Sequence, residues 1–185
     1  MRYTRYSQVC CFRIFRGRLT ANPSWGWLEH FKFNKSLEQC NALLLGIPKT
    51  QLDRLQHIQN MAARIVTRAK RHDHIRPILA SLHWLPIPFR IRYKVLLLTF
   101  KALNGLAPLY LTDLLHDYQP TRQLRSGMQH LLKVPSTRYS TVGDRAFSNG
   151  APKLWNNLSL DIRSCRTVET FKTRLKAFMF KQAYV

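Results

Sequence analysis

The segment over residues 89–104 places the strongest constraint on the fold. Its apolar residues, from Tyr93 through Leu103, cover most of a helical circumference instead of a single stripe. Gly105 follows at the position where helices often end in a left-handed residue, and Pro108 comes shortly after it. A helix that is apolar on almost every side has to be surrounded by other elements. The segment therefore predicts the central core helix of a mainly α domain.

A second helix is predicted to begin near Thr50, where Asp53 completes a capping-box signal. At about 100° per residue, its apolar residues fall in one arc beside an arc of basic residues. The apolar arc contains Leu52, Leu55, Ile58, Ala62, Ile65 and Val66, and the basic arc contains Arg54, His57, Arg64 and Arg68. Lys70, Arg71 and His72 extend the positive charge past the helix. This pattern is typical of a helix that faces phosphates, although a solvated charged face is the commoner outcome.

Further helices are predicted on both sides of these two. Asp73 is the predicted N-cap of a short helix that ends before Pro86 and Pro88. The others span 108–115, 145–154 with Pro152 kinking or ending it, and 167–181 with Thr167 as N-cap. Residues 117–143 form a long loop with two candidate strands, 130–134 and 139–142. The expected fold is a small helical bundle of about five to six helices, with a long basic loop or a short β-hairpin around 120–143.

The chain is predicted to have three parts. Residues 1–36 mix aromatic and arginine side chains without a persistent period, which favours a poorly ordered arm. The alternative for this arm is a basic-aromatic contact to nucleic acid. Residues 37–72 hold the first predicted helix, and residues 73–185 form a helical C-terminal domain.

The balance of charge indicates the kind of partner. The sequence has 30 Lys and Arg against 9 Asp and Glu, a formal net charge of +21. Such a chain repels itself and needs an anionic partner, most often nucleic acid, with an anionic membrane surface as the second candidate. The longest apolar run, residues 95–98, is far too short to cross a bilayer. The cysteines, Cys10, Cys11, Cys40 and Cys165, show no zinc spacing and indicate an intracellular environment, nuclear or cytoplasmic.

The residues that most enzymes of nucleic-acid metabolism need are missing. A polymerase holds two divalent metals about 4 Å apart between paired acidic residues, but no two aspartates here are adjacent. The sequence also lacks glycine-rich phosphate loops and the H-E-x-x-H motif. His72, Asp73 and His74 are followed by no further ligand at a zinc spacing, so a helix cap is favoured. We expect no catalytic residue, no metal and no cofactor, and only a Ser-His-Asp arrangement stays open because it forms in space.

Several strings, taken in order, resemble one family. They are residues 40–48 (CNALLLGIP), 55–64 (LQHIQNMAAR), 82–86 (LHWLP), 100–105 (FKALNG), 145–147 with 151–156 (RAF, APKLWN) and 171–176 (FKTRLK). Together they resemble the segment that follows the polymerase palm in non-LTR (LINE-type) retrotransposon reverse transcriptases. The resemblance covers about residues 36–185.

The resemblance implies a role without catalysis. The family copies RNA into DNA, but its fingers, palm and adjacent aspartates have no counterpart here, so no catalytic residue is carried over. The chain resembles the thumb end, at about 40–70, and the tail after it, regions that hold template RNA or target DNA. One departure is Leu158-Ser159, where the family pattern has Leu-Pro.

These arguments predict a nucleic-acid-binding remnant that contacts RNA or DNA phosphates largely independently of sequence, through arginine forks and lysines. The candidate residues are Arg54, Arg64, Arg68, Lys70, Arg71, Arg90, Lys94, Lys101, Arg122, Arg125 and Arg138. For Trp84 and Trp155, burial in the core is favoured over stacking on bases. The alternatives are a translated relic without a selected function and a protein-interaction domain.

Overall fold

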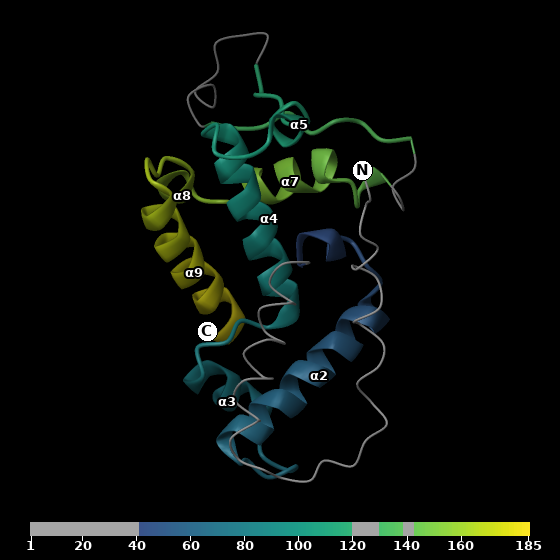
Figure 1. The fold of residues 1–185 in the computed structure, drawn as a ribbon, viewed down its shortest axis with the longest axis vertical. Helices are drawn as coiled ribbons and strands as arrows, with labels where there is room; N and C mark the ends of the chain where they lie inside the picture. The colour runs from purple at the N-terminus through teal and green to yellow at the C-terminus, as the bar shows by residue number, and fades with distance from the viewer. Residues whose placement is uncertain (1–40, 120–129, 139–142) are drawn as a thin grey trace, which may run out of the picture. The chain divides into compact units, whose positions relative to one another are not determined.

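The computed structural model describes residues 41–119, 130–138 and 143–185. By their contacts the residues divide into Met1–Asn34 and Lys35–Val185, so every described residue belongs to the second unit. The predicted arm over 1–36 and the basic residues Arg122 and Arg125 lie outside the described residues. The elements are η1 (Asn41–Leu44), α2 (Lys49–Thr67), α3 (Ile75–Ser81), α4 (Ile87–Leu103), α5 (Leu109–Thr112), α7 (Phe147–Asn156), α8 (Leu160–Arg163) and α9 (Val168–Tyr184) (Figure 1). The predicted mainly α fold is confirmed.

Helix α4 is the central element. It contacts η1, α2, α5, α7 and α9, and in Figure 1 it runs through the middle of the described helices, with α9 on one side and α7 and α2 on the other. Its buried residues include Ile91, Val95 and Phe100, so the predicted core helix is confirmed. It begins earlier than predicted, because Pro86 is its N-cap and Pro88 lies in its first turn, where the missing N–H costs nothing.

Aromatic side chains from three helices meet in the core. Phe171 of α9 is fully buried and stacks on Phe100 of α4, with ring centroids 4.2 Å apart. Trp155 of α7 stacks on Phe171, with ring centroids 5.9 Å apart, and donates its indole N–H to the carbonyl of His130 at 2.8 Å. The predicted burial of Trp155 is therefore confirmed, and its one polar atom is paired.

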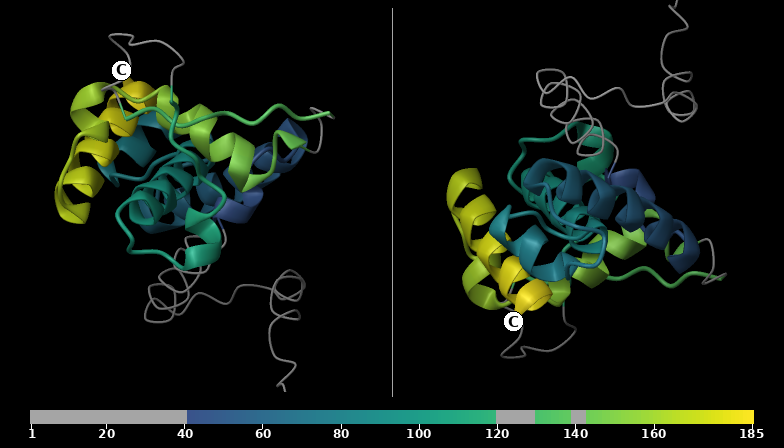
Figure 2. Two further views of the ribbon diagram at one scale, coloured as in Figure 1. Left: turned by 90° about the horizontal axis from the view of Figure 1, so that it is seen from above. Right: turned by 90° about the horizontal axis from the view of Figure 1, so that it is seen from below.

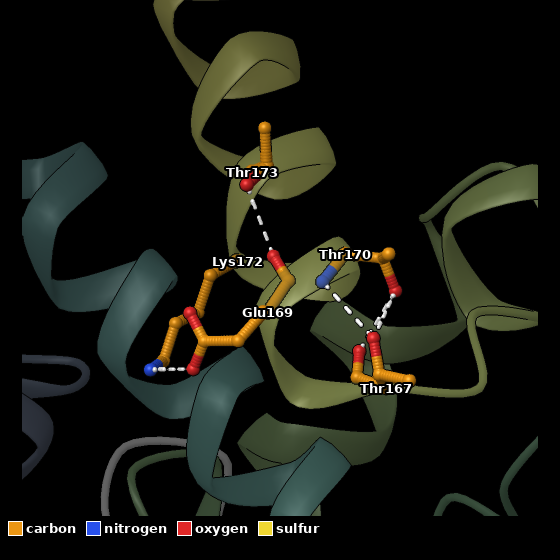
Figure 3. Close-up of polar contacts among 5 residues, drawn as sticks. All are labelled: Thr167, Glu169, Thr170, Lys172 and Thr173. Atoms are coloured by element: carbon orange, nitrogen blue, oxygen red, sulfur yellow. Dashed lines mark hydrogen bonds and ion pairs between the residues drawn. The ribbon is translucent and has the colours of Figure 1, made fainter.

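Helix α9 begins where the sequence predicted. The Thr167 hydroxyl accepts the N–H of Thr170 at 3.3 Å, which satisfies one of the donors that a helix start leaves unpaired (Figure 3). Lys172 and Glu169 form an ion pair at 2.7 Å in the same turns. The helix continues to Tyr184, beyond the predicted end near residue 181.

Two predicted caps are wrong. Helix α2 begins at Lys49 with Pro48 as N-cap, so Thr50 is already inside the helix and no side chain caps it. Asp73 does not cap α3, whose N-cap is His74. Its carboxylate instead accepts the backbone N–H of Lys70 at 2.7 Å and closes the turn before α3.

The burial of α2 also differs from the predicted arc. Its buried residues are Gln59 and Ala63, whereas Ile65 is 68% exposed. Leu55 and Ile58 are only half-buried. The helix therefore turns a more polar face to the domain than its apolar pattern indicated.

The predicted strand over 130–134 is wrong. Within the described residues there is no strand, and only an isolated antiparallel bridge joins Asp117 to Leu132. The side-chain amide of Asn156 donates to the Leu132 carbonyl at 2.8 Å and accepts its N–H at 2.9 Å. With both backbone groups bonded to a side chain, Leu132 has none left for a neighbouring strand. The second candidate strand, 139–142, lies outside the described residues.

The predicted helices over 108–115 and 145–154 are present as α5 and α7, but their first and last residues differ from the prediction. Helix α5 is confined to Leu109–Thr112, and α7 begins after Ala146 and includes Pro152 in its buried face. Gly105 has the predicted positive φ, 68°, directly after the end of α4. The short helix α8 was not predicted.

Candidate nucleic-acid interface

The predicted cations cluster where α2 ends. Arg68 has a left-handed φ of 53°, which stops the helix and turns the chain toward α3. We call residues 68–73 the basic turn. Within it Asp73 and Lys70 exchange two bonds, because Asp73 also donates its N–H to the Lys70 carbonyl at 3.2 Å. The turn is thus held by its own backbone and one carboxylate.

Arg64 supports the basic turn from inside. Its guanidinium donates to the carbonyls of Asp73, at 2.8 Å, and Arg71, at 3.3 Å. Its Nε is buried and has no hydrogen-bond partner among the described residues. Arg64 was predicted to contact phosphate, but the structure bonds its Nη2 to two backbone carbonyls of the turn. Arg64 is therefore a positioning residue for the exposed cations of the basic turn.

Three predicted cations are presented by the basic turn. The side chains of Arg68, Lys70 and Arg71 are exposed. In the part of the chain that the structure describes, the ion pairs join Lys153 to Asp144 and Lys172 to Glu169, away from this turn. None of the three forms an ion pair within the described residues, and with Asp73 as its one carboxylate the turn keeps a net positive charge, as a phosphate-binding surface requires.

The other predicted cations are spread more widely. Arg54 is exposed about 15 Å along α2 from Arg64, since each helical residue rises about 1.5 Å. Arg90 lies in the first turns of α4, where its Nε donates to the Leu85 carbonyl at 2.9 Å. Lys94 and Lys101 are half-buried further along α4, and Arg138 is exposed after the bridge at Leu132. Of the predicted cations that the structure describes, Arg64, Arg68, Lys70 and Arg71 are gathered in one place.

Two glutamines that the sequence analysis did not single out orient α2. The buried Gln59 donates to the Leu85 carbonyl at 2.9 Å, and the Gln56 side-chain oxygen accepts the N–H of Ile87 at 2.9 Å. The second bond satisfies a free donor at the start of α4. Because both bonds join α2 to the start of α4, they also fix the direction in which α2 presents the basic turn. In the sequence, the two glutamines could have been noticed because they are three residues apart, about one helical turn, and lie next to apolar residues.

A second group of side chains joins the end of α9 to the linker between α3 and α4. The Tyr184 hydroxyl donates to the Trp84 carbonyl, and Arg76 donates to the Ala183 carbonyl at 3.0 Å. Burial raises the pKa of Tyr184, although the nearby Arg90 and Arg76 act in the opposite direction. The view from below in Figure 2 shows this end of α9 beside α3. We call His83, Trp84, Phe180 and Tyr184 the aromatic clasp.

Three of the carboxylates that the structure describes, those of Asp73, Asp144 and Glu169, have hydrogen-bond or ion-pair partners. Asp144 accepts from Lys153 and Asn149, each at 2.8 Å, and the hydrogen bond from Lys153 is the main cause that lowers its pKa. Over the described ranges, no three His, Cys, Asp or Glu side chains gather as a metal site would require. His72 and His74 flank Asp73 in sequence, with His74 as the N-cap of α3, and the Asp73 carboxylate accepts the backbone N–H of Lys70.

One buried cation lies outside the predicted set. Arg163 of α8 is 8% exposed, and its Nε and Nη1 have no hydrogen-bond partner in the described part of the chain. Burial lowers the pKa of its guanidinium. Because so little of it is exposed, Arg163 is not part of the surface formed by the basic turn.

None of the helices described here combines the length and the apolar content that crossing a bilayer would need. No protein-family model, curated protein or solved structure matches this chain. The resemblance to LINE-type reverse transcriptases therefore stays a prediction from the sequence strings.

Proposed function

We propose that this chain is a non-catalytic nucleic-acid-binding remnant of a LINE-type RNA-directed DNA polymerase, which contacts RNA or DNA through backbone phosphates. The observation that carries the proposal is the basic turn, where Arg68, Lys70 and Arg71 are exposed and form no ion pair within the described residues. Phosphate contacts of this kind give affinity without reading sequence.

The construction of the turn supports binding with little rearrangement. Arg64 and Asp73 fix its backbone, so only the exposed side chains have to become ordered when phosphate binds. The turn also follows the C-terminal end of α2, where the helix dipole is negative and stabilises nearby cations. With a net charge of +21 the whole chain attracts polyanions, and the turn supplies a fixed point of contact.

Binding is expected to weaken steeply with salt. If about 5–8 phosphates are contacted, the slope of log affinity against log salt is roughly −4 to −7, because each contact releases condensed counterions. The measurement is a titration of labelled RNA and DNA with the purified chain over a series of salt concentrations. Affinity that does not change with salt would refute the proposal.

The basic turn is tested by a matched pair of variants. Arg68→Gln, Lys70→Gln and Arg71→Gln together should reduce the magnitude of the salt slope by about 2–3. The control, Lys49→Gln, Arg166→Gln and Lys176→Gln, removes the same charge from exposed positions elsewhere and should change the slope less. Equal effects of the two variants would assign binding to net charge alone. In a primer-extension assay we expect no nucleotide incorporation, and incorporation would contradict the non-catalytic role.

A protein-interaction role is the second candidate, because apolar side chains are exposed around α5. Leu106 is 60% exposed, Leu109 78% and Tyr110 67%. Apolar residues gathered in this way often mark a contact surface. If this surface binds a protein, a complex that survives nuclease should be lost in Leu109→Ser while the affinity for nucleic acid is unchanged. A relic without function would be indicated by the absence of a cooperative thermal transition.

A further inference from the structure

The aromatic clasp contains a row of rings that reaches the surface. His83 stacks on Phe180, with centroids 5.8 Å apart and ring planes 23° apart. Phe180 in turn contacts Tyr184 at 4.6 Å. Phe180 and Tyr184 are half-buried, whereas His83 is exposed. Because Phe180 stacks on one face of the His83 imidazole, a further ring has to stack on the opposite face.

The backbone holds His83 in a conformation that favours glycine. The His83 N–H bonds the Ala80 carbonyl at 3.0 Å, and the Trp84 N–H bonds the Leu79 carbonyl at 2.9 Å. This pair of bonds is the Schellman motif that ends many helices, and its left-handed position is His83, with φ of 53°. Glycine adopts this conformation at the least cost, so the end of α3 does not require an imidazole there.

The imidazole is also held in orientation. Its Nδ1 lies 3.3 Å from the Ser81 carbonyl and, when protonated, donates to it. Phe180 supports the ring from one side. A ring fixed in this way loses little freedom when another flat group stacks on it.

The surroundings of the clasp are cationic. The Arg90 guanidinium lies 5.8 Å from the centre of the Trp84 ring, and Arg76 and Lys181 are exposed on α3 and α9. The sequence has no Asp or Glu between Asp73 and Asp113, and none after Glu169. The segments that form the clasp therefore bring positive charge and aromatic surface together without an Asp or Glu of their own.

Exposed rings among cations suit an unpaired nucleobase. Each base has a π face that stacks on an aromatic ring, and the phosphates beside it are attracted to Arg and Lys. In a duplex the bases already stack on one another, so their faces are not accessible to a protein ring without unstacking. The seven residues of α3 rise about 10 Å and separate the basic turn from His83.

We propose that the aromatic clasp is a stacking site for an unpaired base of single-stranded nucleic acid, with His83 as the contacting ring and Arg76 and Lys181 beside the neighbouring phosphates. The inference rests on the proposed function and names its ligand class. The basic turn accounts for phosphate affinity, and the clasp accounts for a preference for single strands over duplexes.

The experiment uses the full chain and three labelled probes of equal length, about 12 nucleotides. They are a single strand with bases, an abasic single strand and a duplex. We expect the single strand with bases to bind about ten-fold more tightly than the abasic strand, since stacking of one base contributes on that scale. Equal affinity for these two probes, with the salt dependence retained, would overturn the stacking site and leave the proposed function intact. Loss of salt-dependent binding to every probe would overturn both.

The variant His83→Gly removes the ring and keeps the left-handed turn. It should lower affinity for the single strand with bases about five- to ten-fold and leave the abasic strand unchanged. His83→Asn, which also tolerates this conformation, should do the same and guards against loss of folding. The matched control is His116→Ala, which removes an exposed histidine that belongs to neither the basic turn nor the aromatic clasp. Unchanged binding in both His83 variants, or an equal loss in the control, would overturn the proposal.

Discussion

At the scale of single residues, a polar side chain caps a helix only if a backbone N–H without a partner lies within its reach. Thr50 and Thr167 have the same chemistry and similar sequence signals. Thr167 lies one residue before α9 and accepts the Thr170 N–H, whereas Thr50 lies inside α2 after Pro48 and caps nothing. The same residue type is a cap in one place and an exposed helix residue in the other.

This contrast predicts different costs for the same substitution. Thr167→Ala should destabilise the protein by about 1 kcal/mol, because the N–H of Thr170 loses its acceptor. Thr50→Ala should leave the free energy of unfolding within about 0.5 kcal/mol of the parent, since alanine favours helix and no bond is lost. Urea denaturation of the three proteins measures the difference. Equal destabilisation by the two substitutions would contradict the assignment of the caps.

At the scale of elements, polar bonds as well as apolar burial decide how α2 meets α4. Gln59 is 2% exposed and lies between Gln56 and the Leu85 carbonyl. The apolar residue Ile65 on the same helix is largely exposed. Two side chains of the helix thus bond backbone groups at and just before the start of α4. Gln56 accepts the Ile87 N–H, and Gln59 donates to the Leu85 carbonyl, which also accepts from Arg90.

Removing that bond should weaken both the fold and the binding surface. Gln59→Ala should cost about 1–3 kcal/mol of unfolding free energy, because a buried bond is lost and a cavity is left. Gln51→Ala, at an exposed position of α2, is the matched control. Chemical denaturation measures the stability, and the salt slope for RNA shows whether the basic turn is still presented. A loss in the control as large as that in Gln59→Ala would contradict the tie between α2 and α4.

At the scale of the whole molecule, a net charge of +21 acts on folding and binding in opposite ways. Like charges on one chain repel each other and destabilise its compact form. The same charges attract a polyanion. Salt screens both effects over about 10 Å at 0.1 M.

Salt should therefore stabilise the free protein while it weakens the complex. We expect the thermal midpoint of the protein alone to rise as sodium chloride is increased from about 0.02 to 0.3 M, because self-repulsion is screened. Calorimetry measures this midpoint. An equal osmolality of glycerol serves as the control for effects unrelated to charge. A midpoint that falls over this range would show that attraction between charges, and not repulsion, dominates the folded state.

The sequence by itself determined the features that depend on neighbouring residues along the chain. The central helix, the stop at Gly105 and the cap at Thr167 follow from local backbone and side-chain chemistry, and the burial of Trp155 follows from its apolar neighbours. The gathering of charge after Arg64 was also visible, because residues of one turn are adjacent in sequence.

Only the tertiary structure decided the features that depend on partners distant in sequence. It placed the Arg64 guanidinium under the basic turn, engaged Leu132 with Asn156, and brought Tyr184 to Trp84 across about a hundred residues. A periodic pattern shows which face of a helix is apolar, but it does not show which unpaired carbonyl or N–H that face will meet. The packing of the whole chain decides where unpaired carbonyl and N–H groups lie. Here Gln59, which bonds such a group, is buried, and Ile65 is exposed.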